Sequence, residues 1–182
     1  QRLLSRTHGG ALAHDVAYEL PVRYRDGQQR DAKRAIARTA VMRLPSGPHV
    51  VGLTGGTTTS EVARALADRS ELTVVTNALN IAMILGAVPG NAVHMPGGQF
   101  KAPTLSLTGD KSAEYFRNIF AGKLFLATAG VASDSGLTYP SFADLPRITR
   151  LARPFARIPH LGKRLRQLSA PFISRFTSPK YA

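Results

Sequence analysis

The chain has 182 residues, 43% of them hydrophobic, a formal net charge of +13, and neither cysteine nor tryptophan. This length fits one domain with an appendage and can bury a core without a disulfide or a structural metal. The lack of cysteine excludes disulfide scaffolds, thiolate zinc sites and cysteine nucleophiles. No apolar run approaches the roughly 18 residues of a membrane span, and residues 1–15 lack a signal-peptide pattern, so we expect a cytoplasmic protein.

The positive charge is concentrated near the C-terminal end. Residues 141–182 hold nine Lys and Arg against the single acid Asp144, which gives this segment +8 of the total of +13. A basic segment suggests contact with nucleic acid, but the suggestion applies to this part alone. Five prolines interrupt any helical period there: Pro146, Pro154, Pro159, Pro171 and Pro179. We therefore expect an irregular basic tail over residues 145–182.

Before the tail, most of the chain alternates between the apolar period of a helix and that of a strand. Residues 1–11 show neither period over a useful length, and Gly9-Gly10 marks a joint or turn. Beyond them the patterns predict helices at 31–44, 61–66, 78–85 and 110–120, and strands at 49–53, 72–76, 92–95 and 123–127. Ser60 is the expected N-cap of the second helix. Strands and helices that alternate through short polar turns predict an α/β fold, with a parallel sheet covered by helices.

The strongest local signal for a ligand is Thr54-Gly-Gly-Thr-Thr-Thr-Ser60, between an expected strand and an expected helix. Two glycines let the backbone approach a ligand closely, and the hydroxyls and helix N–H groups suit a phosphate or another anion. The segment has neither the Gly-Lys-[Ser/Thr] ending of a Walker A loop nor the Gly-x-Gly-x-x-Gly of dinucleotide-binding proteins. An ordinary strand-to-helix turn with good caps is the alternative interpretation.

Two further polar segments follow expected strands. Thr76-Asn77 and Gly97-Gly98-Gln99 both come after the carboxyl end of a strand, where open α/β sheets bind ligands. Asn77 can donate and accept hydrogen bonds, which suits a sugar hydroxyl. Each segment alone fits an ordinary turn equally well. Three polar strand ends together favour a ligand site.

The other reactive residue types give no pattern for catalysis. The histidines are scattered without metal-ligand spacing: His8, His14, His49, His94 and His160. No Gly-x-Ser-x-Gly motif and no neighbouring pair of carboxylates is present. Lys101 and Lys111 fit a solvated face better than a site. We expect no catalytic residue, no bound metal and no cofactor.

Several of these stretches follow one another in a familiar order and spacing: Arg6-Thr-His-Gly-Gly-Ala11, residues 19–25 and 33–37, Gly55-Gly-Thr-Thr-Thr59, Val75-Thr-Asn77, Gly97-Gly98, and residues 105–109 and 125–131. Together they resemble the effector-sensing domain of DeoR-family bacterial transcriptional regulators, over about residues 6–144. The resemblance implies a three-layer, parallel-sheet fold similar to ribose-5-phosphate isomerase and glucosamine-6-phosphate deaminase.

The resemblance also implies a function. In these regulators a phosphorylated sugar binds the sensor and changes how an attached winged helix-turn-helix holds its operator. The phosphate would bind at Gly55, Gly56, Thr57, Thr58, Thr59 and Ser60, and the sugar would face Asn77, Gly97, Gly98 and Gln99. Homo-oligomers are expected, as in the family.

The chain also departs from the family pattern. The helix-turn-helix is expected to be missing, as is the later part of the sensor, so specific DNA binding by the family's route is not expected of this chain. The expected organisation is a hinge remnant at 1–18, an incomplete sensor at 19–144 and the basic tail at 145–182. A frameshifted or truncated gene is one hypothesis for the tail, since out-of-frame GC-rich DNA encodes Arg, Pro, Ser and Ala.

Two other functions are weighed against the sensor. An isomerase or deaminase on the same fold would carry an Asp-Gly-Ala-Asp-Glu run and acidic residues after a Gly-Gly segment, whereas Gly98 leads into Gln-Phe-Lys-Ala-Pro. A nucleic-acid-binding tail would bind phosphates in a salt-dependent way, but only Phe155, Phe172 and Phe176 are available for base stacking. Weak non-specific DNA binding by the tail is compatible with the sensor function.

Overall fold

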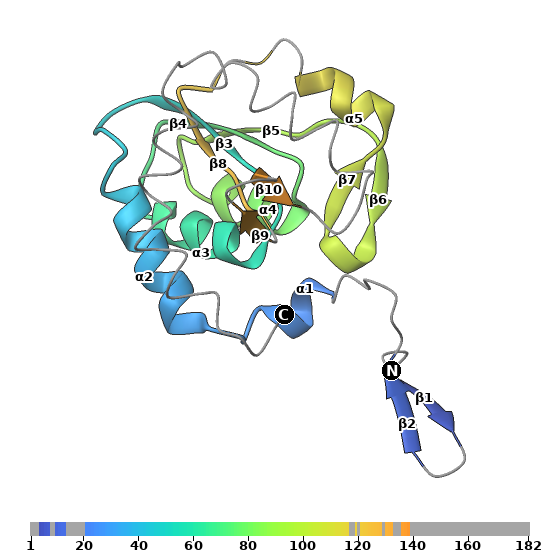
Figure 1. Ribbon diagram of the computed structural model, residues 1–182. Helices are drawn as coiled ribbons and strands as arrows, with labels where there is room; N and C mark the ends of the chain where they lie inside the picture. Colours follow the sequence, from blue (N-terminus) through green and yellow to red (C-terminus); the bar gives the residue numbers. More distant parts are fainter. Residues whose placement is uncertain are drawn as a thin grey trace.

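A four-stranded parallel sheet forms the centre of the computed structural model, in the strand order β5-β4-β3-β8 (Figure 1). Its strands are β3 (His49–Leu53), β4 (Leu72–Thr76), β5 (Ala92–His94) and β8 (Lys123–Phe125). The structure describes residues 21–116, 119 and 121–128, and in addition the strands β1 (Leu4–Thr7), β2 (Gly10–Ala13), β9 (Gly130–Ala132) and β10 (Gly136–Thr138).

Helices connect the parallel strands. α3 (Thr57–Leu66) joins β3 to β4, and α4 (Leu79–Gly86) joins β4 to β5. The strands are short apolar runs rich in valine, which pack well in a sheet that is covered on both faces. The predicted α/β fold with a parallel sheet is confirmed.

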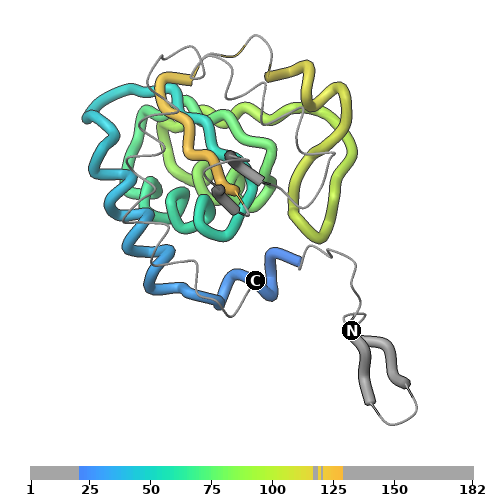
Figure 2. The backbone as a smooth tube through the Cα atoms, in the orientation of Figure 1, coloured from blue at the N-terminus to red at the C-terminus, as the bar shows by residue number. Residues whose placement is uncertain are grey.

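The two faces of the sheet carry separate cores, which gives three layers. On one face, α3, α4 and α2 (Arg30–Val41) pack against strand side chains such as Val51 and Val74. On the other face, Val75 packs with Phe116, directly after α5 (Asp110–Tyr115). Figures 1 and 2 show α2 and α3 on one side of the sheet and α5 on the other. The outer helix α2 covers α3 through Ala37, which is 1% exposed.

Eight of the described elements were not predicted from the sequence: β1, β2, β9 and β10, and four short ones between residues 22 and 108. β6 (Gln99–Lys101) and β7 (Ser106–Thr108) form an antiparallel hairpin around the 3-10 helix η1 (Ala102–Thr104), and α1 (Val22–Arg25) precedes α2. Each has only three or four residues, too few to show a period. Residues 1–11 show no useful period in the sequence, yet β1 and β2 pair as antiparallel strands, with Thr7 opposite Gly10.

The predicted element boundaries agree with the structure for strands better than for helices. The bounds of β3 and β4 coincide with the prediction, whereas α3 begins at Thr57, four residues before its predicted start. Ser60 is therefore inside the helix, and the predicted N-cap at this residue is wrong. The predicted tail at 145–182 lies outside the described residues.

Within the described part of the chain, no helix combines the length and the apolar character that crossing a membrane requires.

Candidate ligand-binding site

The strand order defines where a ligand site is expected. From β3 the chain moves to β4 and β5 on one side, and it later returns to β8 on the other side of β3. At such a reversal, open α/β sheets bind ligands in a crevice between the loops that follow the two adjacent strands. Here those loops are residues 54–56, after β3, and residues 126–128, after β8.

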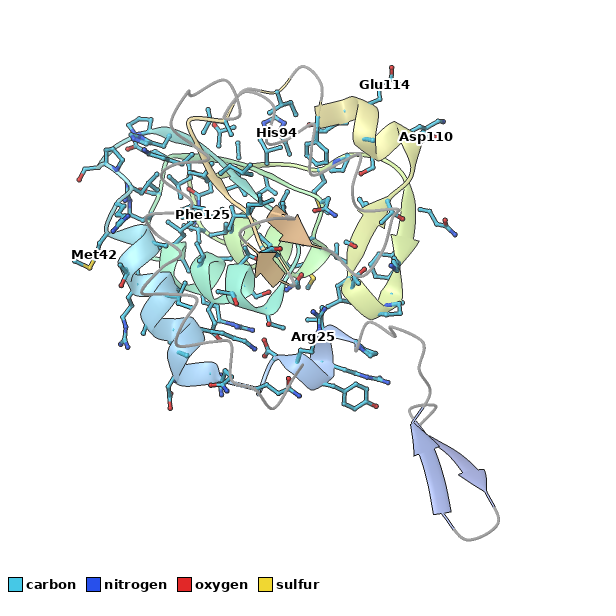
Figure 3. All side chains as sticks on the ribbon, in the orientation of Figure 1. Arg25, Met42, His94, Asp110, Glu114 and Phe125 are labelled. Atoms are coloured by element: carbon cyan, nitrogen blue, oxygen red, sulfur yellow. The ribbon has the colours of Figure 1, made fainter. Side chains whose placement is uncertain are left out.

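Thr54 ties these two loops together. Its backbone N–H donates to the carbonyl of Phe125 over 3.1 Å, and its Oγ1 accepts from the backbone N–H of Ala127 over 2.8 Å. Phe125 is labelled in Figure 3, on the strand that ends here. The Thr54 residue is 2% exposed, so both bonds lie in the interior, where polar groups need partners. Thr54 therefore fixes the floor of the crevice and leaves Gly55 and Gly56 above it.

Gly56 is required by its surroundings. Its φ of 155° lies in a region that side-chain-bearing residues rarely adopt. A Cβ added there would lie 2.8 Å from the Cβ of Ala127 and 3.1 Å from Oγ1 of Thr59. The absence of a side chain lets the loop after β3 pack directly on the loop after β8, and α3 begins at the next residue.

The hydroxyls in the first turn of α3 divide into two pairs. Those of Thr59 and Ser60 both donate to the carbonyl of Gly56, over 3.0 and 2.7 Å, and Ser60 also accepts from Asn80 Nδ2 over 2.7 Å. Within the described residues, no side chain caps α3 and no hydrogen bond is found for the hydroxyls of Thr57 and Thr58. The first-turn N–H groups and these two hydroxyls are thus available to an anion.

Asn77, after β4, is part of the wall rather than of an open surface. It is 0% exposed, its Nδ2 donates to the carbonyl of Leu107 over 3.2 Å, and its carbonyl accepts from the N–H of Leu107 over 2.8 Å. These bonds join the end of β4 to the β6–β7 hairpin. The Oδ1 of Asn77 is buried and has no hydrogen-bond partner among the described residues, so it could accept from a hydroxyl or a water.

The hairpin forms a side of the site that sequence analysis did not find. A Cβ on Gly55 would lie 3.6 Å from the Cβ of Ala78 and 3.8 Å from the Cβ of Ser106. The hydroxyls of Ser106 and Thr104 are 2.7 Å apart. Between them Leu105 adopts a left-handed conformation with φ 52°, which directs its carbonyl to the N–H of Leu79 at 2.8 Å. An unusual conformation for leucine at this point marks a turn held by its surroundings.

The third predicted segment, Gly97-Gly98-Gln99, lies at the other end of the hairpin. Gln99 pairs with Thr108, whereas Ser106, at the opposite end of β7, is the residue beside Gly55. Gly98 has φ 144°, and a Cβ there would lie 2.5 Å from the carbonyl oxygen of Thr108. Its contacts attach β6 to β7. The structure thus brings residues 55–60 together with Asn77 and Ser106. Gly98, in contrast, lies against Thr108 of the hairpin.

Lys101 was set aside in the sequence as part of a solvated face. In the structure it is partly buried and pairs with Ser106 across the hairpin, so their side chains project from the same face. That face is the one on which Ser106 approaches Gly55. Lys111, by contrast, is exposed on α5. Only the register of the β6–β7 hairpin distinguishes Lys101 from Lys111, and the sequence has no pattern that predicts this hairpin.

An ion-pair network lies one helical turn beyond the first residues of α3. Glu61 is only 5% exposed, and its carboxylate lies 2.7 Å from Arg64 Nη1, 3.8 Å from Arg34 Nε and 4.0 Å from Arg30 Nε. Arg64 also pairs with Asp26 at 3.6 Å. These arginines compensate the buried charge of Glu61 and lock α3 to α2, since a buried carboxylate is tolerated only when it is paired.

Lys33 joins the edge of this network. Its Nζ donates to the carbonyl of Arg25 over 2.6 Å. Burial lowers the pKa of Lys33 below its ordinary value of 10.5, and the positive charge of Arg25 lowers it further, against the opposing effect of Asp26 and Glu61. Keeping Lys33 charged in the folded protein therefore costs free energy.

The groups at the end of β3 are mainly backbone N–H groups and hydroxyls. No cluster of His, Cys, Asp and Glu that could hold a metal occurs in the part of the chain that the structure describes. The carboxylates of Asp110 and Glu114 point outward from α5 (Figure 3). The loop after β3 thus combines a helix N-terminus with threonine and serine hydroxyls, groups of the kind that bind anions in proteins, and Lys101 lies on the neighbouring hairpin.

Fold and sequence together define an α/β domain with a glycine- and hydroxyl-rich loop where the strand order of the sheet reverses. The chain belongs to the DeoR C-terminal sensor domain family, whose pattern matches residues 28–153. This membership confirms the resemblance found in the sequence and the similarity of the fold to sensor domains.

The similar proteins include named bacterial repressors. The HTH-type transcriptional repressor CsqR of Escherichia coli is 31% identical over 137 residues, which cover 75% of this chain and 52% of that protein. The transcriptional repressor AccR of Agrobacterium fabrum is 35% identical over 136 residues, covering 74% and 52%. The glycerol-3-phosphate regulon repressor of Escherichia coli is 29% identical over 137 residues, covering 75% and 54%. The chain thus spans about half the length of the curated relatives it matches.

The lowered pKa of Lys33 predicts a specific pH dependence of stability. Between its folded pKa and 10.5 the unfolded chain binds more protons than the folded one. The free energy of unfolding therefore rises with pH across this window and stops rising above it. Urea unfolding should be measured for the wild type and for Lys33→Met over this pH range. As the pH rises, the free energy of unfolding of the wild type should increase relative to that of the variant. A constant difference would show that burial does not perturb this lysine.

Proposed function

We propose that this domain is the effector-binding part of a DeoR-type transcriptional repressor and that it binds a phosphorylated sugar or polyol. The phosphate binds at the first turn of α3, against Gly55, Gly56 and the hydroxyls of Thr57 and Thr58. The observation that carries the proposal is the uncapped N-terminus of α3 at the switch point of the sheet. The name of one relative, the glycerol-3-phosphate regulon repressor, agrees with a phosphorylated effector.

The rest of the ligand would lie toward the β6–β7 hairpin. Ser106 and Thr104 offer hydroxyls beside Gly55, and Lys101 supplies a positive charge on the same face. Asn77 holds this wall in place through Leu107, and its free Oδ1 can accept from a ligand hydroxyl or from an intervening water. Gly97, Gly98 and Gln99 would contact only an effector that extends along the hairpin.

The effector would act on DNA through a winged helix-turn-helix in the same regulator, as in the family, and in the cytoplasm. Two recognition arms are needed to read a two-fold operator, so we also propose a homo-oligomer. The named relatives are repressors, and among the described residues no pair of acidic and basic groups faces the loop to perform an isomerase or deaminase reaction. We therefore propose a sensor without catalytic activity.

Thermal unfolding with a panel of ligands tests the proposal. The panel is glycerol 3-phosphate, ribose 5-phosphate, fructose 6-phosphate, their unphosphorylated parents and inorganic phosphate. A phosphorylated compound should raise the midpoint while its parent does not, because a ligand of the native state adds about 2.7 kcal/mol of stability at a hundredfold excess over its Kd. A panel without any shift would contradict the proposal.

The site of binding is tested in the same assay with two matched variants. Thr58→Val should keep the midpoint of the free protein but weaken binding roughly tenfold or more, because a hydrogen bond to a charged group contributes about 1.5–3 kcal/mol. Thr59→Val should lower the midpoint of the free protein instead, because the Thr59 hydroxyl holds the carbonyl of Gly56. Equal ligand affinity in wild type and Thr58→Val would place the phosphate elsewhere.

The proposed role of Lys101 gives a separate prediction. Lys101→Met should weaken binding of the phosphorylated compound about tenfold, because it removes a charge-assisted bond, and leave binding of any unphosphorylated compound unchanged. Lys111→Met is the control, since Lys111 is exposed on α5, across the sheet from α3. Isothermal titration calorimetry measures both. Equal losses in the two variants would mean that only net charge matters.

A further inference from the structure

The helix α1 has little stability of its own. It has four residues, and isolated helices of this length do not persist in water. Only Val22 is buried, at 7% exposure, whereas Tyr24 is 53% exposed. Its last residue is Arg25, labelled in Figure 3. The position of α1 is therefore set by what it contacts in the rest of the domain.

One of these contacts leads to the proposed site through η1. The helix α1 packs against η1, the three-residue helix at the turn of the β6–β7 hairpin. The carbonyl oxygen of Thr104, in η1, lies 4.0 Å from the position of a Cβ on Gly55. One side of η1 thus faces the loop that would hold the anion, and α1 covers η1 from another direction.

A second connection runs through charged groups. Asp26 directly follows α1, and its N–H donates to the carbonyl of Val22 over 2.9 Å. The carboxylate of Asp26 pairs with Arg64, and Arg64 donates to Glu61 over 2.7 Å. Both Glu61 and Arg64 belong to α3, whose first turn is the anion-binding end. The end of α1 is therefore held by the same helix that would hold the ligand.

We propose that α1 reports occupancy of the loop: an anion bound at the first turn of α3 stabilises α1 in its docked position, through η1 and through the Asp26–Arg64 ion pair. The inference rests on the proposed function. A ligand that orders Gly55 and the start of α3 fixes both surfaces on which α1 docks. By reciprocity, docking of α1 strengthens ligand binding by the same factor. Because α1 follows the segment that resembles the family's hinge, its docking passes the signal toward the N-terminal side of the regulator.

Amide hydrogen exchange of the full chain tests this. The reporting amides are those of Tyr24, Asp26 and Gln28, which donate to carbonyls of residues 21, 22 and 25. The ligand is the panel compound with the largest thermal shift. In the wild type it should slow exchange at these amides roughly fivefold or more. In Asp26→Asn the ligand should still raise the midpoint, but the slowing at the amides of residues 24 and 26 should be lost. Asp31→Asn, an acid exposed in the first turn of α2, is the control and should behave as wild type.

Each outcome decides between the two proposals. A ligand that raises the midpoint without slowing exchange at α1 overturns the inference and leaves the proposed function standing. Full slowing in Asp26→Asn also overturns it, because the ion pair would then not be needed. Loss of slowing in Asp31→Asn as well would show a general charge effect and overturn it too. If no panel compound raises the midpoint, the proposed function fails, and the inference fails with it.

Discussion

The pairing of β3 with both β4 and β8 is the constraint on which the site depends. Because β3 pairs with β4 on one side and with β8 on the other, the loops that follow β3 and β8 lie side by side at the end of the sheet. Thr54 joins them by two hydrogen bonds, and Gly56 lets them touch. Neither loop could form the crevice alone. The N-terminus of α3 is directed to this point only because both strands end there.

The polar groups near the loop have different tasks, although they are chemically alike. The hydroxyls of Thr59 and Ser60 satisfy the Gly56 carbonyl, and the Nδ2 of Asn77 satisfies the Leu107 carbonyl. These groups stabilise the fold around the loop, because a buried carbonyl without a hydrogen-bond partner costs free energy. The hydroxyls of Thr57 and Thr58 make no hydrogen bond within the described residues, and they are the ones that we propose for the ligand. The run of four hydroxyl residues thus divides into two that serve the fold and two that the proposed function assigns to binding.

The ion pairs around Glu61 extend the same arrangement outward. A carboxylate that is 5% exposed needs its arginines, so the start of α2 is bound to α3 as a condition of burying Glu61, and Arg64 also pairs with Asp26 after α1. The first turn of α3 is therefore not an isolated helix end. Ion pairs tie this helix to α2, and through Asp26 it reaches the four-residue helix α1.

The sequence by itself determined the α/β fold, the bounds of β3 and β4, and the glycine-threonine segment after β3, because each is written in neighbouring residues. Apolar runs between Gly, Pro and polar turns define strands without reference to the rest of the chain. It did not show that α3 begins at Thr57, since threonine and serine favour caps as much as helices and only the Gly56 carbonyl decides between them. The β6–β7 hairpin, the position of Lys101 and the bond between Thr54 and Ala127 were decided by tertiary structure. The last of these joins residues 73 positions apart, and contacts at such separations depend on how the whole sheet is ordered rather than on any local pattern.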